Sequence, residues 1–327
     1  MPTFFTDPAA AKKEQLIKRL KIREIRAFGY SSDGLPLLAG KPGIIEKYDV
    51  SGELVESYAF WEGTSEVRMT VSIDERGNKI KTYCYDGMEF HVYDSSQRLI
   101  ERRLYNEKGR IRERIRYEYE KPSEMIEIRR EYNHKDKCLG KSVCKSDERG
   151  NTLFEAFFDD SGDPISKCSC VYDGTFRIAR TVEWGVMTRR ARGRSSVRYL
   201  GMLYSDYRYQ YDNQGNLVKK LCHKADETID WNRSEFYRYD QNNQKTEESG
   251  VDEDGRIGWR LTFGYDTAGN LASTIFVGAD GSMIHSKAWI YNEQGLISEL
   301  LIENPEDNLS HRYVYSYKYY CGYGNQQ

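Results

Sequence analysis

The chain has few prolines, no long apolar run and no strong excess of either charge. Its 327 residues include only 7 prolines, and no proline-rich stretch separates two domains. No segment approaches the roughly 18 consecutive apolar residues of a membrane-spanning helix, and the first apolar pair ends at Phe5, so no signal peptide is visible. A formal net charge of −2 disfavours a surface built to coat nucleic acid. We therefore expect a cytoplasmic protein with neither a membrane nor a nucleic acid as its partner.

Motifs for metal binding and catalysis are also lacking. The 7 cysteines are scattered, and without an export signal this pattern is typical of reduced thiols. Cys168 and Cys170 share one face of an expected strand, but no second pair and no nearby histidine completes a zinc site. The 5 histidines lie in no recognised serine, cysteine or metal motif. We expect no enzyme activity, no catalytic residue, no cofactor and no metal.

What the chain does contain is a short motif that recurs at near-constant spacing. An aromatic or β-branched residue is followed by Asp or Asn, two variable residues and usually Gly. The clearest copies are Tyr211–Gly215, Val251–Gly255, Tyr265–Gly269 and Tyr291–Gly295. From Asn243 the motif ends at Gly255, Gly269, Gly281 and Gly295, in steps of 12, 14, 12 and 14 residues. This period of about 26 residues, made of two half-units, indicates a repeat architecture.

The residues between the motifs alternate in the manner of β-strands. After Gly109, apolar Ile111, Ile115 and Tyr117 alternate with arginines. Strict alternation places successive side chains on opposite faces of a strand. In each motif the Asp can bond the backbone two residues on, and the Gly supplies the left-handed conformation that closes a tight turn. The spacing thus predicts hairpin after hairpin.

We predict an all-β fold, an antiparallel β-hairpin repeat meander that forms an open curved or spiralling sheet with a short N-terminal helix as cap. Residues 1–30 form the helix and cap, and residues 31–320 form a single repeat domain. The repeat is degenerate over residues 163–204, where Gly174, Thr188 and Gly201 fall near the expected turn positions. The helix is expected over residues 7–20, with Thr6 or Asp7 capping it. Its apolar stripe serves either as a packed terminal cap or as a docking surface for a partner.

Tyrosine is abundant, with 26 copies, and it often occurs as a pair just before a turn, as in Tyr117 and Tyr119. Rings at matching places in neighbouring strands can pack as cross-strand ladders. The same rings could instead form an aromatic platform for carbohydrate or peptide, and the sequence leaves both interpretations open.

One segment departs from the repeat and is the best candidate for a binding site. Residues 187–198 contain five arginines within ten residues, at a register position expected to be the tip of an extended hairpin. Clustered guanidinium groups suit carboxylate or phosphate ligands. The alternative is a solvated loop without a binding role. The candidate partner-binding residues are Arg189, Arg190, Arg192, Arg194 and Arg198, with Trp184 and Tyr199 expected to pack the base of the loop.

The motif of an aromatic residue, Asp, two variable residues, Gly, Asn and Leu, as in Tyr211–Leu217 and Tyr265–Leu271, resembles the tyrosine-aspartate (YD) repeats of the RHS family. The resemblance covers roughly residues 44–310 and is strongest over 205–300. It implies a spiralling strip of β-hairpins, which in large family members encloses a toxin or cargo segment. This chain is too short to enclose much, and it has no self-cleaving core motif and no toxin domain after the repeats, so an open sheet with a concave binding face is the expectation.

Two functions remain possible. The first is a non-enzymatic protein-binding scaffold, an accessory, immunity or target protein of a bacterial toxin or defence system, with an acidic protein surface as the partner of the arginine-rich loop. The second is a protein that binds carbohydrate or a surface polymer through the Tyr- and Trp-rich sheet face.

Overall fold

The computed structural model describes residues 8–31, 33–38, 41–59, 67–74, 78–84, 87–106, 108–120, 125–190, 197–305 and 309–320. These residues form one α-helix, one short 3-10 helix and 22 strands, and every pairing between strands is antiparallel. The fold is therefore all-β with an N-terminal helix, as the sequence predicts. The chain divides into two compact units, Met1–Met88 with Trp259–Gln327, and Glu89–Gly258.

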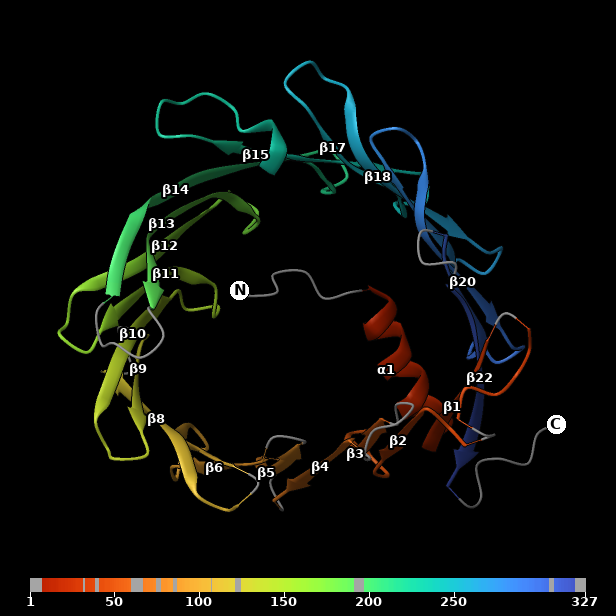
Figure 1. Ribbon diagram of the computed structural model, residues 1–327, viewed down its shortest axis with the longest axis horizontal. Helices are drawn as coiled ribbons and strands as arrows, with labels where there is room; N and C mark the ends of the chain where they lie inside the picture. The colour runs from red at the N-terminus through yellow and green to blue at the C-terminus, as the bar shows by residue number, and fades with distance from the viewer. Residues whose placement is uncertain are drawn as a thin grey trace. The chain divides into compact units, whose positions relative to one another are not determined.

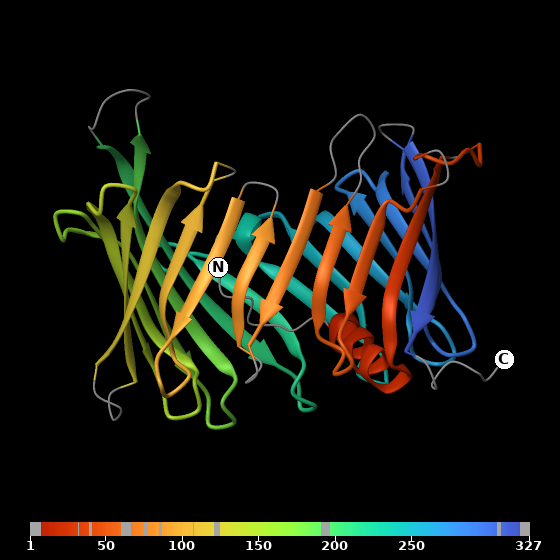
Figure 2. The same cartoon turned by 90° about the horizontal axis from the view of Figure 1, so that it is seen from below.

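The first unit joins the two ends of the chain. Strand β1 pairs with β2 on one side and with β22, the last strand, on the other. The hydrogen-bonded order of this unit is β5-β4-β3-β2-β1-β22-β21-β20-β19-β18, and Figure 2 shows its first hairpins lying side by side in chain order. Its elements are α1 (Pro8–Leu20), β1 (Ile22–Ser31), β2 (Ile44–Tyr48), β3 (Leu54–Ala59), β4 (Val67–Ile73), β5 (Lys79–Cys84), β18 (Ile257–Tyr265), β19 (Leu271–Gly278), β20 (Met283–Tyr291), β21 (Ile297–Asn304) and β22 (Leu309–Tyr319).

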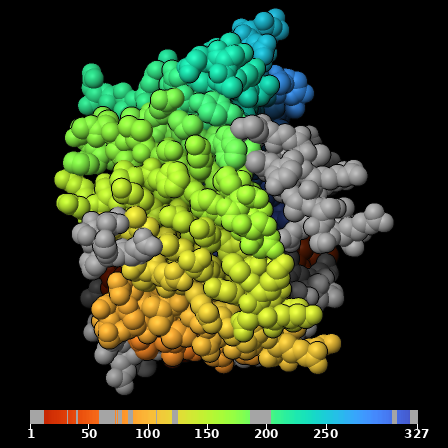
Figure 3. Space-filling view, turned by 90° about the vertical axis from the view of Figure 1, so that its left-hand side faces the viewer, coloured from red at the N-terminus to blue at the C-terminus, as the bar shows by residue number. Residues whose placement is uncertain are grey.

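The second unit is a meander in which each strand from β7 to β17 pairs with the next one along the chain. Figure 3 shows one face of this unit, where side chains from the yellow to the green strands pack side by side without a deep hollow. Its strands are β7 (Leu99–Tyr105), β8 (Ile111–Glu120), β9 (Ile126–Asn133), β10 (Cys138–Ser146), β11 (Thr152–Asp159), β12 (Pro164–Tyr172), β13 (Ile178–Arg190), β14 (Val197–Tyr211), β15 (Leu217–His223), β16 (Glu235–Tyr239) and β17 (Lys245–Val251). The 3-10 helix Trp231–Arg233 precedes β16, and β6 (Gly87–Tyr93) crosses from the first unit into the second.

The Asp-x-x-Gly motifs lie at chain reversals, which confirms the central prediction from the spacing. At Asp212 the carboxylate accepts hydrogen bonds from the backbone amides of Gln214 and Asn216, at 2.9 and 2.8 Å. The amide of Gly215 donates to the carbonyl of Asp212 at 3.1 Å, and Gly215 has φ +91°. This left-handed conformation suits glycine because it lacks a Cβ. The same turn position has positive φ without glycine at Gln97, Asp136, Phe176, Glu227 and Asn243.

The prediction of turns near Thr188 and Gly201 is wrong. Both residues lie inside strands, Thr188 in β13 and Gly201 in β14. The turn expected at Gly174 is present and closes two residues later, at Phe176. Between Phe176 and the next motif the chain therefore makes one long hairpin where the rhythm predicts two short turns. Residues 187–201 contain no Asp-x-x-Gly motif, so the hydrogen bonds of the motif's turn cannot form there. Strand β13 therefore continues to Arg190, and β14 begins at Val197.

Helix α1 packs on the sheet of the first unit and closes its core. Ile17 is 3 % exposed and packs with Ile22, Ile25, Tyr48 and Leu296, which come from both ends of the chain. Figure 1 shows the helix against the concave side of this unit's strands. The helix thus covers a face of the sheet, while β1 after it has a partner on each side.

The C-terminus of α1 is stabilised by basic residues. Lys18 and Arg19 in the last turn interact favourably with the partial negative charge at this end of the helix. The helix is followed by Lys21, whose φ of +50° is left-handed. The expected caps Thr6 and Asp7 lie outside the described residues. With 13 residues, α1 is shorter than the roughly 20 needed to cross a bilayer, and the described part of the chain contains no helix that could do so.

Tyrosines at strand ends link the two strands of their own hairpin by hydrogen bonds. In four hairpins a tyrosine hydroxyl near the end of the second strand donates to the carbonyl at the start of the first, 20 residues earlier, at 2.6–3.0 Å. These pairs are Tyr119 with Leu99, Tyr172 with Thr152, Tyr291 with Leu271, and Tyr317 with Ile297. These hydroxyls are partly buried, and each bond contributes about 1 kcal/mol. These contacts favour the packing interpretation of the tyrosines.

Candidate functional site: the extended β13–β14 hairpin

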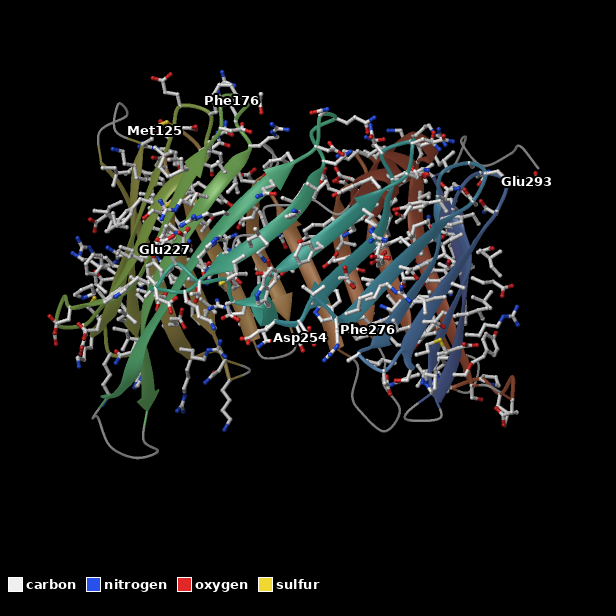
Figure 4. The ribbon with its side chains drawn as sticks, turned by 90° about the horizontal axis from the view of Figure 1, so that it is seen from above. Met125, Phe176, Glu227, Asp254, Phe276 and Glu293 are labelled. Atoms are coloured by element: carbon white, nitrogen blue, oxygen red, sulfur yellow. The ribbon has the colours of Figure 1, made fainter. Side chains whose placement is uncertain are left out.

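The hairpin of β13 and β14 is longer than the others in the described part of the second unit. Its strands have 13 and 15 residues, and they pair from Arg180 opposite Arg208 to Arg190 opposite Val197. Figure 4 shows Phe176, in the turn before β13, at one end of the strands, and the hairpin extends past its neighbours at the other end, as Figure 2 also shows. The strands of this extended hairpin include residues 187–190 and 197–198 of the predicted tip, and residues 191–196 lie outside the described residues.

The structure places the predicted binding residues along the far end of this hairpin. Arg189 and Arg190 end β13, and Arg198 and Tyr199 lie near the start of β14. The register sets Arg189 directly opposite Arg198, and Thr188 opposite Tyr199. Arg192 and Arg194 lie outside the described residues. The backbone thus brings residues of like charge to opposed positions on two paired strands.

Trp184 lies closer to the base of the hairpin than the arginines. It is opposite Tyr204 on β14 and opposite Lys167 on β12, and both aromatic residues are half-buried. Trp184 lies five positions before Arg189 in β13, and the packing of Trp184 below the loop stays a prediction. The register places Tyr199 nearer the arginines than Trp184.

At the base of the hairpin, a buried carboxylate binds two arginines from its two strands. Asp206 on β14 is 1 % exposed. Arg180 on β13 donates to it in a bidentate pair, Nε to Oδ1 and Nη2 to Oδ2, both at 2.8 Å. Arg208 donates from Nη2 to Oδ2 at 3.0 Å, and its other partner is the exposed Glu227. The cluster ties β13 to β14 through charge-assisted hydrogen bonds.

The same cluster fixes the charge of Asp206. Burial raises the pKa of its carboxyl group, but the hydrogen bonds and positive charges of Arg180 and Arg208 outweigh burial and hold the pKa below the usual value. The carboxylate is therefore ionised at neutral pH, and the buried charge is compensated.

A tyrosine fastens the base of this hairpin as in the others, but over a longer span. The hydroxyl of Tyr211 donates to the carbonyl of Ile178 at 2.8 Å, and these residues are 33 apart instead of 20. The difference of 13 residues equals one half-unit of the repeat. The β13–β14 hairpin is thus an ordinary hairpin at its base, lengthened at its far end.

Sequence reasoning missed Arg180, Asp206 and Arg208. One signal for them exists, because Asp206 lies in an alternating stretch without the Gly that would make it a turn residue, and Asp is depleted in strands. An aspartate in such a place needs a cationic partner when it is buried. The partner on β13 could not be assigned because the register of the lengthened hairpin was not predicted.

A second polar contact in the described residues lies on β6. His91 bonds Glu89 through Nε2 at 2.7 Å on β6. Within the described ranges, no group of three or more His, Cys, Asp or Glu side chains could hold a metal ion.

Comparisons with known proteins return only distant likenesses. No protein-family model matches the chain, and no curated protein matches it. Among solved structures, the crystal structure of TcdB2-TccC3-TEV is 12% identical with a TM-score of 0.34, over 83% of this chain and 16% of that chain. A Tc holotoxin pore from Photorhabdus luminescens is 14% identical with a TM-score of 0.27, over 84% of this chain and 15% of that chain.

A porin-like protein from Bacteroides uniformis is 10% identical with a TM-score of 0.31, over 91% of this chain and 98% of that chain. The chain spans about a sixth of the length of the Tc toxin chains it matches. At these TM-scores the likenesses carry no argument about fold or function.

Proposed function

We propose that this chain is a non-enzymatic scaffold that binds another protein through the extended β13–β14 hairpin, with the arginine-rich end of the hairpin against an acidic surface. The observation that carries the proposal is the register, which sets Arg189 opposite Arg198 at the far end of two paired strands. Arg190 follows in the same strand.

Like charges at directly opposed positions of an antiparallel pair destabilise it. Carboxylates of a partner would relieve this repulsion, and they would gain bidentate hydrogen bonds from guanidinium groups. A bound acidic surface is therefore the state in which the lengthened hairpin end is most favourable. Its charge would also speed the encounter with the partner and make the association sensitive to salt.

The base of the hairpin supports this role by holding the two strands together. Asp206 binds Arg180 and Arg208, and Tyr211 bonds Ile178. Because these two arginines already bind carboxylates, the base serves as a support, and the partner is expected to contact the far end. A binding element held by such contacts loses less conformational entropy when its partner arrives.

The finer assignment rests on the sequence. The resemblance to YD repeats supports an accessory, immunity or target protein of a bacterial toxin or defence system. The carbohydrate-binding alternative receives less support, because hydroxyls of several strand-end tyrosines are bonded to backbone carbonyls inside the hairpins.

The proposal can be tested by affinity capture of the full chain, produced at native level in its own cells, followed by mass spectrometry. Binding to each captured protein is then measured for a variant with Arg189→Ser, Arg190→Ser, Arg192→Ser and Arg194→Ser. A matched control replaces four exposed arginines elsewhere with Ser, namely Arg19, Arg110, Arg238 and Arg256. Both variants lose the same charge.

We expect the hairpin variant to bind at least about tenfold more weakly, equal to 1.4 kcal/mol, and the control to bind as the wild type does. The difference in affinity between the hairpin variant and the control variant should diminish as the salt concentration is raised. Capture of no stable partner, or equal affinity of the two variants, would refute the proposal.

A further inference from the structure

Two cysteines on β12 face the same side of the sheet in the second unit, away from the far end of the extended hairpin. Cys170 is 6% exposed, and Cys168 is half-buried. Because side chains alternate along a strand, residues two apart project from the same face. The hydroxyl of Thr181, opposite Cys170 on β13, lies 3.9 Å from the Cys170 Sγ and donates to it. The two thiols therefore form a defined pair with a third polar group beside them.

Strand geometry disfavours a disulfide between these two thiols. An extended strand spaces residues i and i+2 by about 6.6 Å between Cα atoms, at the upper limit of about 6.8 Å for disulfides. Their parallel Cβ vectors would have to converge to about 4 Å, which needs a local distortion of β12. By contrast, two metal–thiolate bonds of about 2.3 Å each span roughly 4.6 Å, which suits side chains projecting in parallel.

Negative groups flank the pair on both sides. Glu155 on β11 and Glu183 on β13 each lie directly opposite Cys168. Opposed residues in neighbouring strands have Cβ atoms about 5 Å apart, so the carboxylates are close enough to favour a cation at the thiols. Cys168 is partly exposed on this face, which gives an ion a path to the pair.

We propose that Cys168 and Cys170 form a two-thiolate site for a soft, thiophilic cation of the Cu(I) type. Soft thiolate ligands favour soft metal ions, of which Cu(I) is one. On binding, each Sγ forms one bond to the cation and each thiol releases one proton, so that two protons leave and the oxidation state of the metal does not change.

Among the cysteines whose side chains the structure describes, Cys144 and Cys222 lie too far away to take part. Cys144 is opposite Glu155, two strands from Cys168, and strands are spaced by about 4.8 Å, so roughly 10 Å separates the two. Cys222 on β15 is three strands from Cys170. A structural zinc site needs four ligands, and the described residues provide no group of three or more. Two-coordinate binding is therefore the geometry available here, with a stoichiometry of one ion.

The test is an anaerobic titration of the reduced full-length protein with Cu(I), in competition with the chelator bicinchoninate. Retained copper is counted, and the ultraviolet charge-transfer band of a copper thiolate is recorded. The test variant is Cys168→Ser with Cys170→Ser. The matched control is Cys138→Ser with Cys144→Ser, which also removes two thiols, both on the neighbouring β10.

We expect one copper per chain, with the charge-transfer band, in the wild type and the control, and at least a tenfold loss of affinity in the test variant. The single variant Cys168→Ser should show the same loss, and its replacement of a partly exposed side chain is compatible with folding, which circular dichroism verifies. If the wild type retains no copper, or the test variant retains as much as the control, the proposal is wrong. Neither result would bear on partner binding by the hairpin.

Discussion

Replacing Asp206 with Asn tests whether the buried carboxylate holds the base of the extended hairpin. The substitution keeps the shape of the side chain and removes its charge. Arg180 then loses the bidentate partner that it contacts at two distances of 2.8 Å, and Arg208 loses a contact at 3.0 Å. Breaking a fully buried pair by removing one partner typically costs about 3–5 kcal/mol.

The magnitude expected here is smaller, because only the acid is buried. Asp206 has 1 % exposure, whereas the side chains of Arg180 and Arg208 are 44% and 40% exposed. Water can solvate the two guanidinium groups once the carboxylate is gone, which lowers the cost. We therefore expect Asp206→Asn to lower the free energy of unfolding by about 2–3 kcal/mol at neutral pH.

The effect should depend on pH in a defined direction. The pKa of Asp206 is lower in the folded protein than its unfolded value of about 3.9. Its stabilising contribution is therefore complete above about pH 4 and is lost as the pH falls through the folded pKa. The difference between wild type and Asp206→Asn should shrink in acid.

Glu227→Gln provides the control, since Glu227 also bonds Arg208 but is 66% exposed. An exposed pair contributes about 0–1 kcal/mol, so this variant should resemble the wild type. The assays are urea unfolding and hydrogen exchange of peptides from β13 and β14, whose amides should exchange faster only in Asp206→Asn. Equal effects of the two substitutions, or no effect of Asp206→Asn at neutral pH, would refute the reasoning.

Three further substitutions test the repeat itself. Tyr291→Phe should lower the free energy of unfolding by about 1 kcal/mol, because the Leu271 carbonyl loses a donor at 2.8 Å; an unchanged urea midpoint would contradict this. Gly281→Ala should cost about 1 kcal/mol, because φ is +80° while the space around it is open. Gly140→Ala should cost more, about 2–3 kcal/mol, because the added Cβ would lie 2.5 Å from the backbone oxygen of Phe158. A larger loss of thermal stability for Gly281→Ala than for Gly140→Ala would show that turn conformation outweighs this clash.

The sequence predicts the fold well because its strongest signals are local. An Asp such as Asp212 makes its turn by bonding amides two and four residues on, so the turn can be predicted without knowing any distant contact. Alternation along β8 is equally local. The helix could be predicted from its cap candidates and its apolar stripe, but not the core it enters. That core needs Leu296 and β22, almost a chain length away.

The candidate site could be predicted only in part, because some of its contacts join residues that are distant in the sequence. The arginines stand out in the sequence, whereas the Asp206 cluster depends on which residues face each other across a hairpin of unknown length. The half-unit rhythm predicted turns at Thr188 and Gly201, and a register built on them would not pair Arg180 with Arg208 as the structure does. Where the turn motif is missing, local rules cannot determine the register.

A repeat of self-contained hairpins can lengthen one member without disturbing its neighbours. The Tyr211 hydroxyl reaches the start of its partner strand across 33 residues, as Tyr172 does across 20, so the base has the same contact in both hairpins. Residues added at the far end leave the pairing of β12 with β13 and of β14 with β15 in place. Asp206 with its two arginines holds the base of the lengthened hairpin together. We therefore expect substitutions at the far end of this hairpin to leave the pairing of β12 with β13 and of β14 with β15 unchanged.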